Sequence, residues 1–280
     1  MMVLFLPGCN LQYSMLYFPS ETAPSEQSLA GSDIRFWPST GQEYRGFIGR
    51  TEIGAARGTF IVFHGNGGTA VGREFYVKAL GRLGYRVILA EYPRYGGRKG
   101  ELGEVSFVKD AAETVRLASE KFGGPIYLLG ESLGCGVAAA VASSTPVPVA
   151  GVVLITPWDS LQSVAKTHFP LLLVRLLLKD SYDTMHNLSS FSGKIAVVGA
   201  ERDEVIPLRH ACNLYQSLSS REIRMWVVGK AGHNDWPMYM DQSWWQEAVG
   251  FVGTGDGHHL YGRRKAQRVG LPERTGRRCI

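Results

Sequence analysis

The stretch at residues 130–134 constrains the fold of this chain more than any other; it reads G-E-S-L-G. It follows the apolar run 126–129 directly and leads into the small-residue run 135–140. This order predicts a buried strand, a very tight turn and a helix that packs close to its neighbours. The glycines on either side of Ser132 permit a strained turn that lifts its hydroxyl to the edge of a sheet, with a helix N-terminus behind it. The stretch therefore predicts a nucleophile elbow.

The other apolar runs alternate with helical patterns along most of the chain. Runs of strand length lie at 59–63, 86–90, 152–155, 195–199 and 224–228, and helices are expected at 74–83, 107–122 and 242–252. Such alternation predicts a parallel sheet with right-handed crossovers. Two earlier short strands, at 34–37 and 44–48, are separated by turn-forming residues. The sheet is therefore expected to begin with antiparallel strands.

A glycine-rich loop follows the first buried strand; residues 64–68 read H-G-N-G-G. Glycines at such a place let the backbone approach a ligand, and free N–H groups can point at a developing negative charge. We interpret the loop as an oxyanion hole formed by the N–H of Asn66 and the N–H of Leu133, with His64 bracing it. A flexible loop or a phosphate-binding loop is the alternative, although the G-K-[ST] ending and the G-x-G-x-x-G spacing are both lacking.

With the segment Y-P-R-Y-G at 92–96, these motifs make the chain resemble the α/β-hydrolase fold family. It looks most like the small, esterase-like serine hydrolases of that family, over about residues 34–252. The resemblance implies a mostly parallel, eight-stranded sheet flanked by helices, with a short cap segment. A glycine usually stands in these relatives where this chain has Arg94, so either a cation faces the mouth of the pocket or a loop arginine is solvated.

The family resemblance also indicates the acid of the site. Relatives carry it in a Gly-x-x-x-Asp-x-x-[Ile/Val]-Pro segment after a late strand, and Asp203 is the matching position. Glu201, Glu204 and Asp159 are the competing carboxylates. Among the seven histidines, only His233 lies in a glycine-rich loop after a late strand and beyond this acid.

The order Ser132, Asp203, His233 is the nucleophile, acid and base order of the family. We therefore expect these three residues to be catalytic.

An almost wholly apolar segment at 169–178 lies between two predicted strands. The resemblance implies a cap, about residues 158–190, that presents an acyl-binding wall; ordinary core packing is the alternative. We expect the substrate pocket to include Tyr95, Trp158, Leu172 and Leu176. The histidines that flank the apolar segment, at 168 and 186, are expected to be surface residues.

The two ends of the chain differ from its body in composition. Residues 1–32 are expected to form a lead-in, whose first nine residues resemble a truncated bacterial lipoprotein signal ending at Cys9. The alternative is an apolar N-terminus packed onto the domain at 33–253. Residues 254–280 hold seven Lys or Arg against two acidic residues, which accounts for the whole net charge of +5. We expect this basic tail to be disordered, and the neutral body gives no reason to expect nucleic acid binding.

Together these features predict a serine esterase that cleaves a small-molecule acyl ester or thioester through an acyl-enzyme. Amide hydrolysis or acyl transfer at the same site, and a non-catalytic envelope binding protein with the same fold, are the alternatives. No metal or organic cofactor is expected, because the cysteines and histidines show no spacing typical of a zinc site. Peripheral or lipid-anchored membrane association is expected if Cys9 is lipidated, which would place the protein in the cell envelope. Without that lipid the protein is expected in the cytoplasm.

Overall fold

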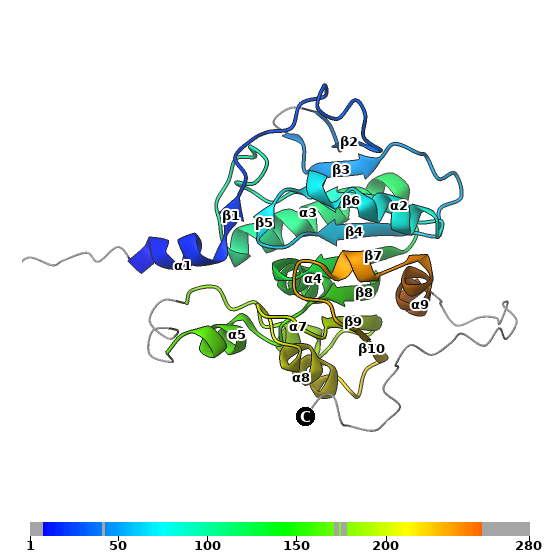
Figure 1. The fold of residues 1–280 in the computed structure, drawn as a ribbon. Helices are drawn as coiled ribbons and strands as arrows, with labels where there is room; N and C mark the ends of the chain where they lie inside the picture. The colour runs from blue at the N-terminus through cyan, green and yellow to red at the C-terminus, as the bar shows by residue number, and fades with distance from the viewer. Residues whose placement is uncertain (1–7, 41–42, 171–173, 175–177, 254–280) are drawn as a thin grey trace, which may run out of the picture.

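The main feature of the fold is one eight-stranded sheet. The computed structural model describes residues 8–40, 43–170, 174 and 178–253. Across the sheet the strand order is β10-β9-β8-β7-β4-β6-β3-β2, which Figure 1 shows from bottom to top. The bounds are β2 (Ile34–Trp37), β3 (Gly46–Gly49), β4 (Thr59–Phe63), β6 (Arg86–Ala90), β7 (Ile126–Glu131), β8 (Val149–Ile155), β9 (Lys194–Ala200) and β10 (Ile223–Val228).

The type of strand pairing changes once across the sheet. β2 pairs with β3, and β3 with β6, in antiparallel register, whereas all pairs from β6 to β10 are parallel. β4 is buried along its whole length, because it lies between two parallel neighbours and is covered on both faces. The predicted fold class is confirmed, including the antiparallel start of the sheet.

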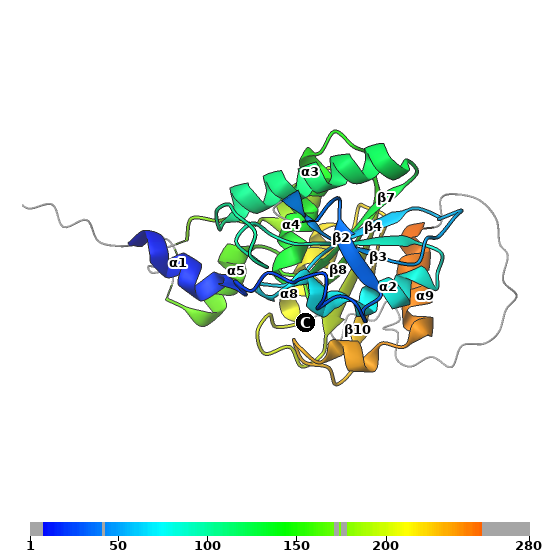
Figure 2. The ribbon, with the colours of Figure 1, turned by 90° about the horizontal axis from the view of Figure 1, so that it is seen from above.

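Helices cover both faces of the sheet, as the view from above shows (Figure 2). One core packs α3 (Glu104–Phe122), α4 (Leu133–Ser144) and α8 (Arg209–Ser217) against one face. A second core packs α2 (Phe75–Gly81) and α9 (Gln242–Gly253) against the other. The shorter helices are η2 (Ala70–Arg73), α5 (Leu161–His168), α7 (Thr184–Leu188) and η3 (Trp236–Tyr239). Within the described ranges every helix is too short or too polar to span a bilayer.

The lead-in contains a helix that the sequence did not predict. This helix, α1 (Gly8–Leu16), lies beside α5, and strand β1 (Phe18–Pro19) follows it (Figure 1). β1 pairs in parallel with β5 (Gly67–Gly68), which belongs to the glycine-rich loop after β4. The lead-in is therefore joined to the loop that the sequence marked as an anion site. The basic tail at 254–280 lies outside the described residues.

Candidate active site

Ser132 stands on the tight turn between β7 and α4, with backbone angles of φ 53° and ψ −115°. A non-glycine residue in this region is strained, and the neighbouring glycines make the turn sterically feasible. A Cβ on Gly130 would lie 2.4 Å from the carbonyl oxygen of Gly134, and one on Gly134 would lie 2.0 Å from that of Phe63. The elbow thus depends on close packing of β4, the turn and α4.

Two hydrogen bonds join Ser132 to the residues predicted as base and acid. The Oγ of Ser132 lies 3.0 Å from Nε2 of His233, and Nδ1 of His233 lies 2.8 Å from Oδ2 of Asp203. All three residues are at most 9% exposed. The other oxygen of Asp203 accepts the backbone N–H groups of Val205 and Ile206, at 2.9 and 2.7 Å. These bonds hold the carboxylate in the orientation that faces His233.

The competing carboxylates lie elsewhere. Glu201 accepts the backbone N–H of Lys230 at 2.8 Å, and Glu204 is exposed at the side of the cavity. Asp159 pairs with a different histidine, His210, at 3.0 Å. Asp203 is therefore the candidate acid that the fold brings to His233.

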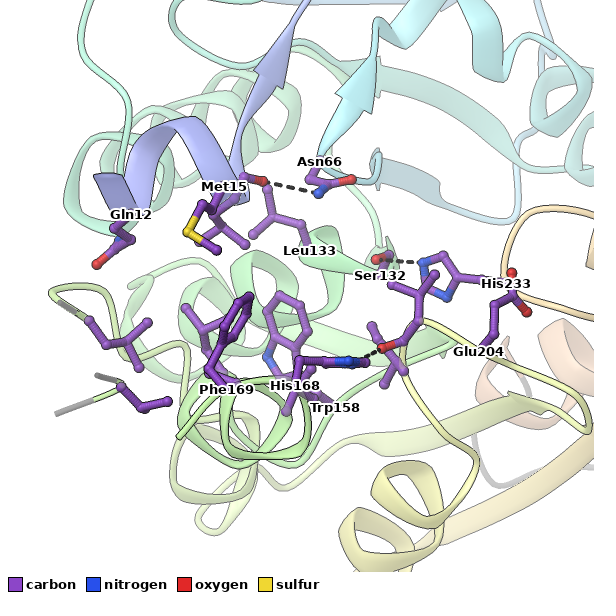
Figure 3. Close-up of a pocket in the computed structure, with 18 of the residues that line it drawn as sticks. Gln12, Met15, Asn66, Ser132, Leu133, Trp158, His168, Phe169, Glu204 and His233 are labelled. Carbon is purple, nitrogen blue, oxygen red and sulfur yellow. Dashed lines mark hydrogen bonds between the residues drawn. The ribbon is translucent and has the colours of Figure 1, made fainter. Parts of the chain in front are cut away.

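The two predicted oxyanion donors, Asn66 and Leu133, both line the cavity onto which Ser132 opens (Figure 3). The carbonyl of Asn66 accepts the N–H of Phe18 at 2.9 Å and the hydroxyl of Tyr95 at 2.6 Å. Its side-chain amide donates to the carbonyl of Leu16 at 3.0 Å. Among the described residues, the backbone N–H groups of Asn66 and Leu133 meet no protein acceptor. Both N–H groups are therefore available as hydrogen-bond donors.

The cavity has a volume of about 710 Å³ and is mainly apolar. Its apolar walls come from α1, the loop after β8, α5, the segment after α5 and the loop after β9. They include Met15, Leu16, Trp158, Leu161, Val164, Phe169, Val174, Leu178, Val205 and Ile206. Figure 3 shows Met15 and Phe169 on opposite sides of it. A cavity of this size and lining fits an acyl chain.

Trp158 lines the cavity, as expected. Leu172 and Leu176 lie outside the described residues, although their described neighbours Val174 and Leu178 line the cavity. The prediction for Tyr95 is wrong. Its side chain is fully buried behind the glycine-rich loop, because its hydroxyl is the one that holds the Asn66 carbonyl.

Arg94, which replaces the glycine usual in relatives, has φ 72° and is exposed. This positive φ explains the family preference, because a side chain in the left-handed region costs about 1–2 kcal/mol. Arg94 is not among the residues that line the cavity. Of the two interpretations, the structure therefore supports a solvated loop arginine.

The contribution of α1 was missed by sequence reasoning. Gln12 lines the cavity and is itself buried, and its side-chain amide donates to Oδ2 of Asp180. Tyr17 donates its hydroxyl to the same carboxylate oxygen and lies 3.2 Å from the hydroxyl of Tyr182. Burial, with these neighbours, raises the pKa of Tyr17 far above its usual range, so it stays a neutral donor. These partners are over 160 residues apart in the sequence, so no local pattern could have found them.

His168 was also missed as a lining residue: it is exposed, as expected, but lies at the side of the cavity, with Nε2 2.9 Å from the carbonyl of Val205. Asn234, next to His233, also lines the cavity. For metals, the described part of the chain has no group of three His, Cys, Asp or Glu residues arranged to hold an ion.

Comparison with known proteins places this geometry in a family. The family model described as alpha/beta hydrolase fold matches residues 58–181. An uncharacterized protein of Mycobacterium tuberculosis is 32% identical over 234 residues, which cover 80% of this chain and 81% of that protein. The chain belongs to the alpha/beta hydrolase fold family.

More distant similarities of this alpha/beta hydrolase are to lipases and esterases. The lysophosphatidylserine lipase ABHD12 of Danio rerio is 27% identical over 174 residues, covering 55% of this chain and 46% of that protein. The esterase Pf2001 of Pyrococcus furiosus has the same fold, with a TM-score of 0.65 at 15% identity, over 85% of this chain and 96% of that one. The family and these similarities support hydrolase activity.

Proposed function

We propose that this alpha/beta hydrolase is a serine esterase that cleaves a carboxylic ester or thioester with an apolar acyl chain. The observation that carries the proposal is the hydrogen-bonded series from Ser132 through His233 to Asp203, which opens onto an apolar cavity. A nucleophile, a base that faces it and an acid that orients the base are the groups that acyl transfer to water requires.

In the proposed reaction, Ser132 attacks the carbonyl carbon while His233 takes the hydroxyl proton at Nε2. Asp203 holds the Nδ1–H tautomer and stabilises the imidazolium that forms. The N–H groups of Asn66 and Leu133 stabilise the oxyanion, and one such donor typically contributes about 2.7–4 kcal/mol. His233 then protonates the departing alcohol or thiol, which leaves an acyl-enzyme. Water, activated by the same histidine, releases the acid and restores Ser132.

The cavity supports the choice of an acyl substrate. Most of its lining side chains are apolar, and the polar ones include Glu204, His168 and Asn234. A hydrocarbon chain gains about 0.8 kcal/mol for each buried CH₂ group, so an apolar wall of this extent favours longer chains. The lipase name of the Danio rerio relative agrees with this class of substrate.

Labelling with a fluorophosphonate probe tests the proposed nucleophile. The wild-type protein is expected to be labelled at Ser132, and Ser132→Ala is expected to remain unlabelled while keeping the wild-type unfolding temperature. A folded wild-type protein that stays unlabelled, or equal labelling of Ser132→Ala, would refute the proposal. A series of p-nitrophenyl esters from C2 to C12 then measures the acyl preference.

We further propose that a lipid on Cys9 would anchor the enzyme beside its own cavity. Cys9 lies in α1, the helix whose later residues Gln12, Met15 and Leu16 line that cavity. A helix rises about 1.5 Å per residue, so Cys9 lies roughly 5 Å along the helix axis from Gln12, the first of these lining residues. The mass of the mature N-terminal peptide tests this, because an unmodified Met1 would exclude the lipid.

A further inference from the structure

A buried pair, His64 and Glu91, contacts the glycine-rich loop and takes no part in the proposed reaction. The two side chains are 1% and 0% exposed. The Nε2 of His64 lies 2.8 Å from Oε1 of Glu91, and its Nδ1 lies 2.7 Å from the carbonyl oxygen of Gly65. A carbonyl oxygen can only accept, so Nδ1 must carry a proton in this arrangement.

The carbonyl of Gly65 and the N–H of Asn66 belong to the same peptide unit. That unit is planar and trans, so its C=O and its N–H point in opposite directions. A donor that fixes the Gly65 carbonyl therefore also fixes the direction of the Asn66 N–H, which is the proposed oxyanion donor. His64 therefore orients the Asn66 N–H by holding the carbonyl at the other end of the same peptide unit.

The contact between His64 and Glu91 needs one further proton between the two atoms. An imidazolium facing a carboxylate and a neutral imidazole facing a carboxylic acid both satisfy it, and in both forms Nδ1 keeps its proton. If the pair loses the shared proton, one ring proton remains for two acceptors. The charged carboxylate is the stronger acceptor, so the proton moves to Nε2, and a bare Nδ1 then repels the Gly65 carbonyl.

We propose that His64 is a positioning residue whose proton, shared with Glu91, holds the Asn66 N–H in the oxyanion hole. The inference rests on the proposed esterase reaction. It predicts that the hole is formed while Nδ1 of His64 donates to the Gly65 carbonyl and is lost when that donor is removed.

The other polar groups around the pair have partners of their own or stay neutral. The carboxylate of Glu91 accepts the backbone N–H of Ala70 at 2.9 Å and that of Tyr92 at 3.2 Å. The nearby phenols stay neutral, because burial raises the pKa of each: Tyr44, Tyr92 and Tyr95. The nearby charged side chains are already in ion pairs: Arg98 with Asp110, Arg45 with Asp110, and Arg73 with Glu131.

Two substitutions of His64 place an amide donor at different positions, so they test whether the donor must lie where Nδ1 is. In His64→Asn the amide nitrogen is as many bonds from the backbone as Nδ1, so it can donate to Gly65. In His64→Gln the amide nitrogen replaces Nε2 instead and leaves the Gly65 carbonyl without its donor. With a short p-nitrophenyl ester we expect kcat of His64→Gln to fall about 100-fold, with KM within about twofold of wild type. His64→Asn is expected to lose less than about tenfold in kcat.

An equal loss in both variants, or a change confined to KM, would overturn the inference. Thermal unfolding of each variant shows whether it folds. If His64→Gln does not fold, Glu91→Gln decides the question, because its amide can donate to Nε2 of His64 at every pH. This donor leaves the ring proton of His64 on Nδ1, so kcat of Glu91→Gln is expected to stay within about tenfold of wild type. A loss of about 100-fold in a folded Glu91→Gln would contradict the role of the Nδ1 proton.

A measurement without turnover keeps this inference separate from the proposed function. In ¹H–¹⁵N spectra of the full chain at one pH, the Asn66 amide signal is expected to move from its wild-type position in His64→Gln and to stay closer to that position in His64→Asn. A wild-type protein that hydrolyses no ester would refute the esterase proposal, whereas an Asn66 signal that moves equally in both variants would refute the role of His64.

Discussion

Two buried histidine–aspartate pairs have different surroundings. In the first, Nδ1 of His233 lies 2.8 Å from Asp203, and Nε2 lies 3.0 Å from the hydroxyl of Ser132. In the second, Nδ1 of His210 lies 3.0 Å from Asp159, and Nε2 lies 3.2 Å from the hydroxyl of Thr167. Each pair thus offers a hydroxyl, a histidine and an aspartate in one series.

The difference lies around the hydroxyl. Ser132 stands on a strained turn beside two backbone N–H groups and opens onto the cavity. Thr167 lies in the last turn of α5, is exposed, and accepts a hydrogen bond from Arg209 at 2.8 Å. The second series joins α5 to α8. The comparison teaches that the setting of the hydroxyl, rather than the histidine–aspartate pair, decides which series can react.

Replacing each aspartate by asparagine gives the largest expected contrast. Asp203→Asn is expected to lower kcat about 10⁴-fold, because asparagine no longer holds the reactive tautomer of the histidine. Asp159→Asn is expected to keep kcat within about threefold of wild type. Steady-state hydrolysis of a p-nitrophenyl ester measures both. Comparable losses in the two variants would mean that the second pair takes part in the reaction.

The pair of Asp159 and His210 should instead affect the free energy of unfolding and its dependence on pH. Burial raises the pKa of Asp159, but hydrogen bonds from His210, from the backbone N–H of Ser160 and from Asn213 outweigh it, so the pKa is lowered overall. A carboxyl whose pKa is lower in the folded state stabilises the fold above its unfolded value of about 3.9. This contribution is lost as pH falls through the folded-state pKa.

We therefore expect Asp159→Asn to lower the free energy of unfolding by about 2 kcal/mol at pH 7, the range for hydrogen bonds to a charged group. The difference in free energy of unfolding between variant and wild type is expected to become smaller below about pH 4, because the wild type loses the same interactions there. Urea unfolding at pH 7, 5 and 3.5 measures both quantities. Parallel curves over this range would show that Asp159 does not carry the pH dependence.

The fold was predictable because each buried strand forms a continuous apolar run. Helix α1 was not, because its sequence has no acidic residue in the first turn, no basic residue in the last, and little amphipathic pattern. Its position depends on Gln12 and Tyr17 meeting Asp180, and such long-range contacts leave no local pattern.

The placement of Ser132, Asp203 and His233 was predictable because parallel strands deliver their following loops to one edge of the sheet. Glu91 also follows a strand, yet nothing in the sequence distinguishes a buried partner of His64 from a loop carboxylate. The orientation of Tyr95 was mispredicted for a related reason. Its direction is set by the carbonyl of Asn66, which only the folded loop brings within reach.

A larger side chain in the cavity tests whether the site of Ser132, His233 and Asp203 binds an acyl chain there. Val164 lines the cavity from α5, so Val164→Trp is expected to shorten the space along that wall. The ratio of kcat/KM for the C12 ester to that for the C2 ester should fall about tenfold, which corresponds to about two buried CH₂ groups. Lys166→Trp, an exposed position on the same helix, is the matched control. A ratio that changes equally in both variants would place the acyl chain elsewhere.

Removing the hydroxyl of the second series gives the smallest expected effect. Thr167→Ala is expected to change kcat by less than about twofold and to lower the free energy of unfolding by about 0.5–1 kcal/mol. The cost is small because Thr167 is exposed, so water can take its place beside Arg209 and His210. Ester hydrolysis and urea unfolding of this variant give the comparison with Ser132→Ala, which also removes a hydroxyl. If Thr167→Ala lost activity to a similar degree, the exposed hydroxyl would also be reactive, and the setting of Ser132 would not explain the choice between the two series.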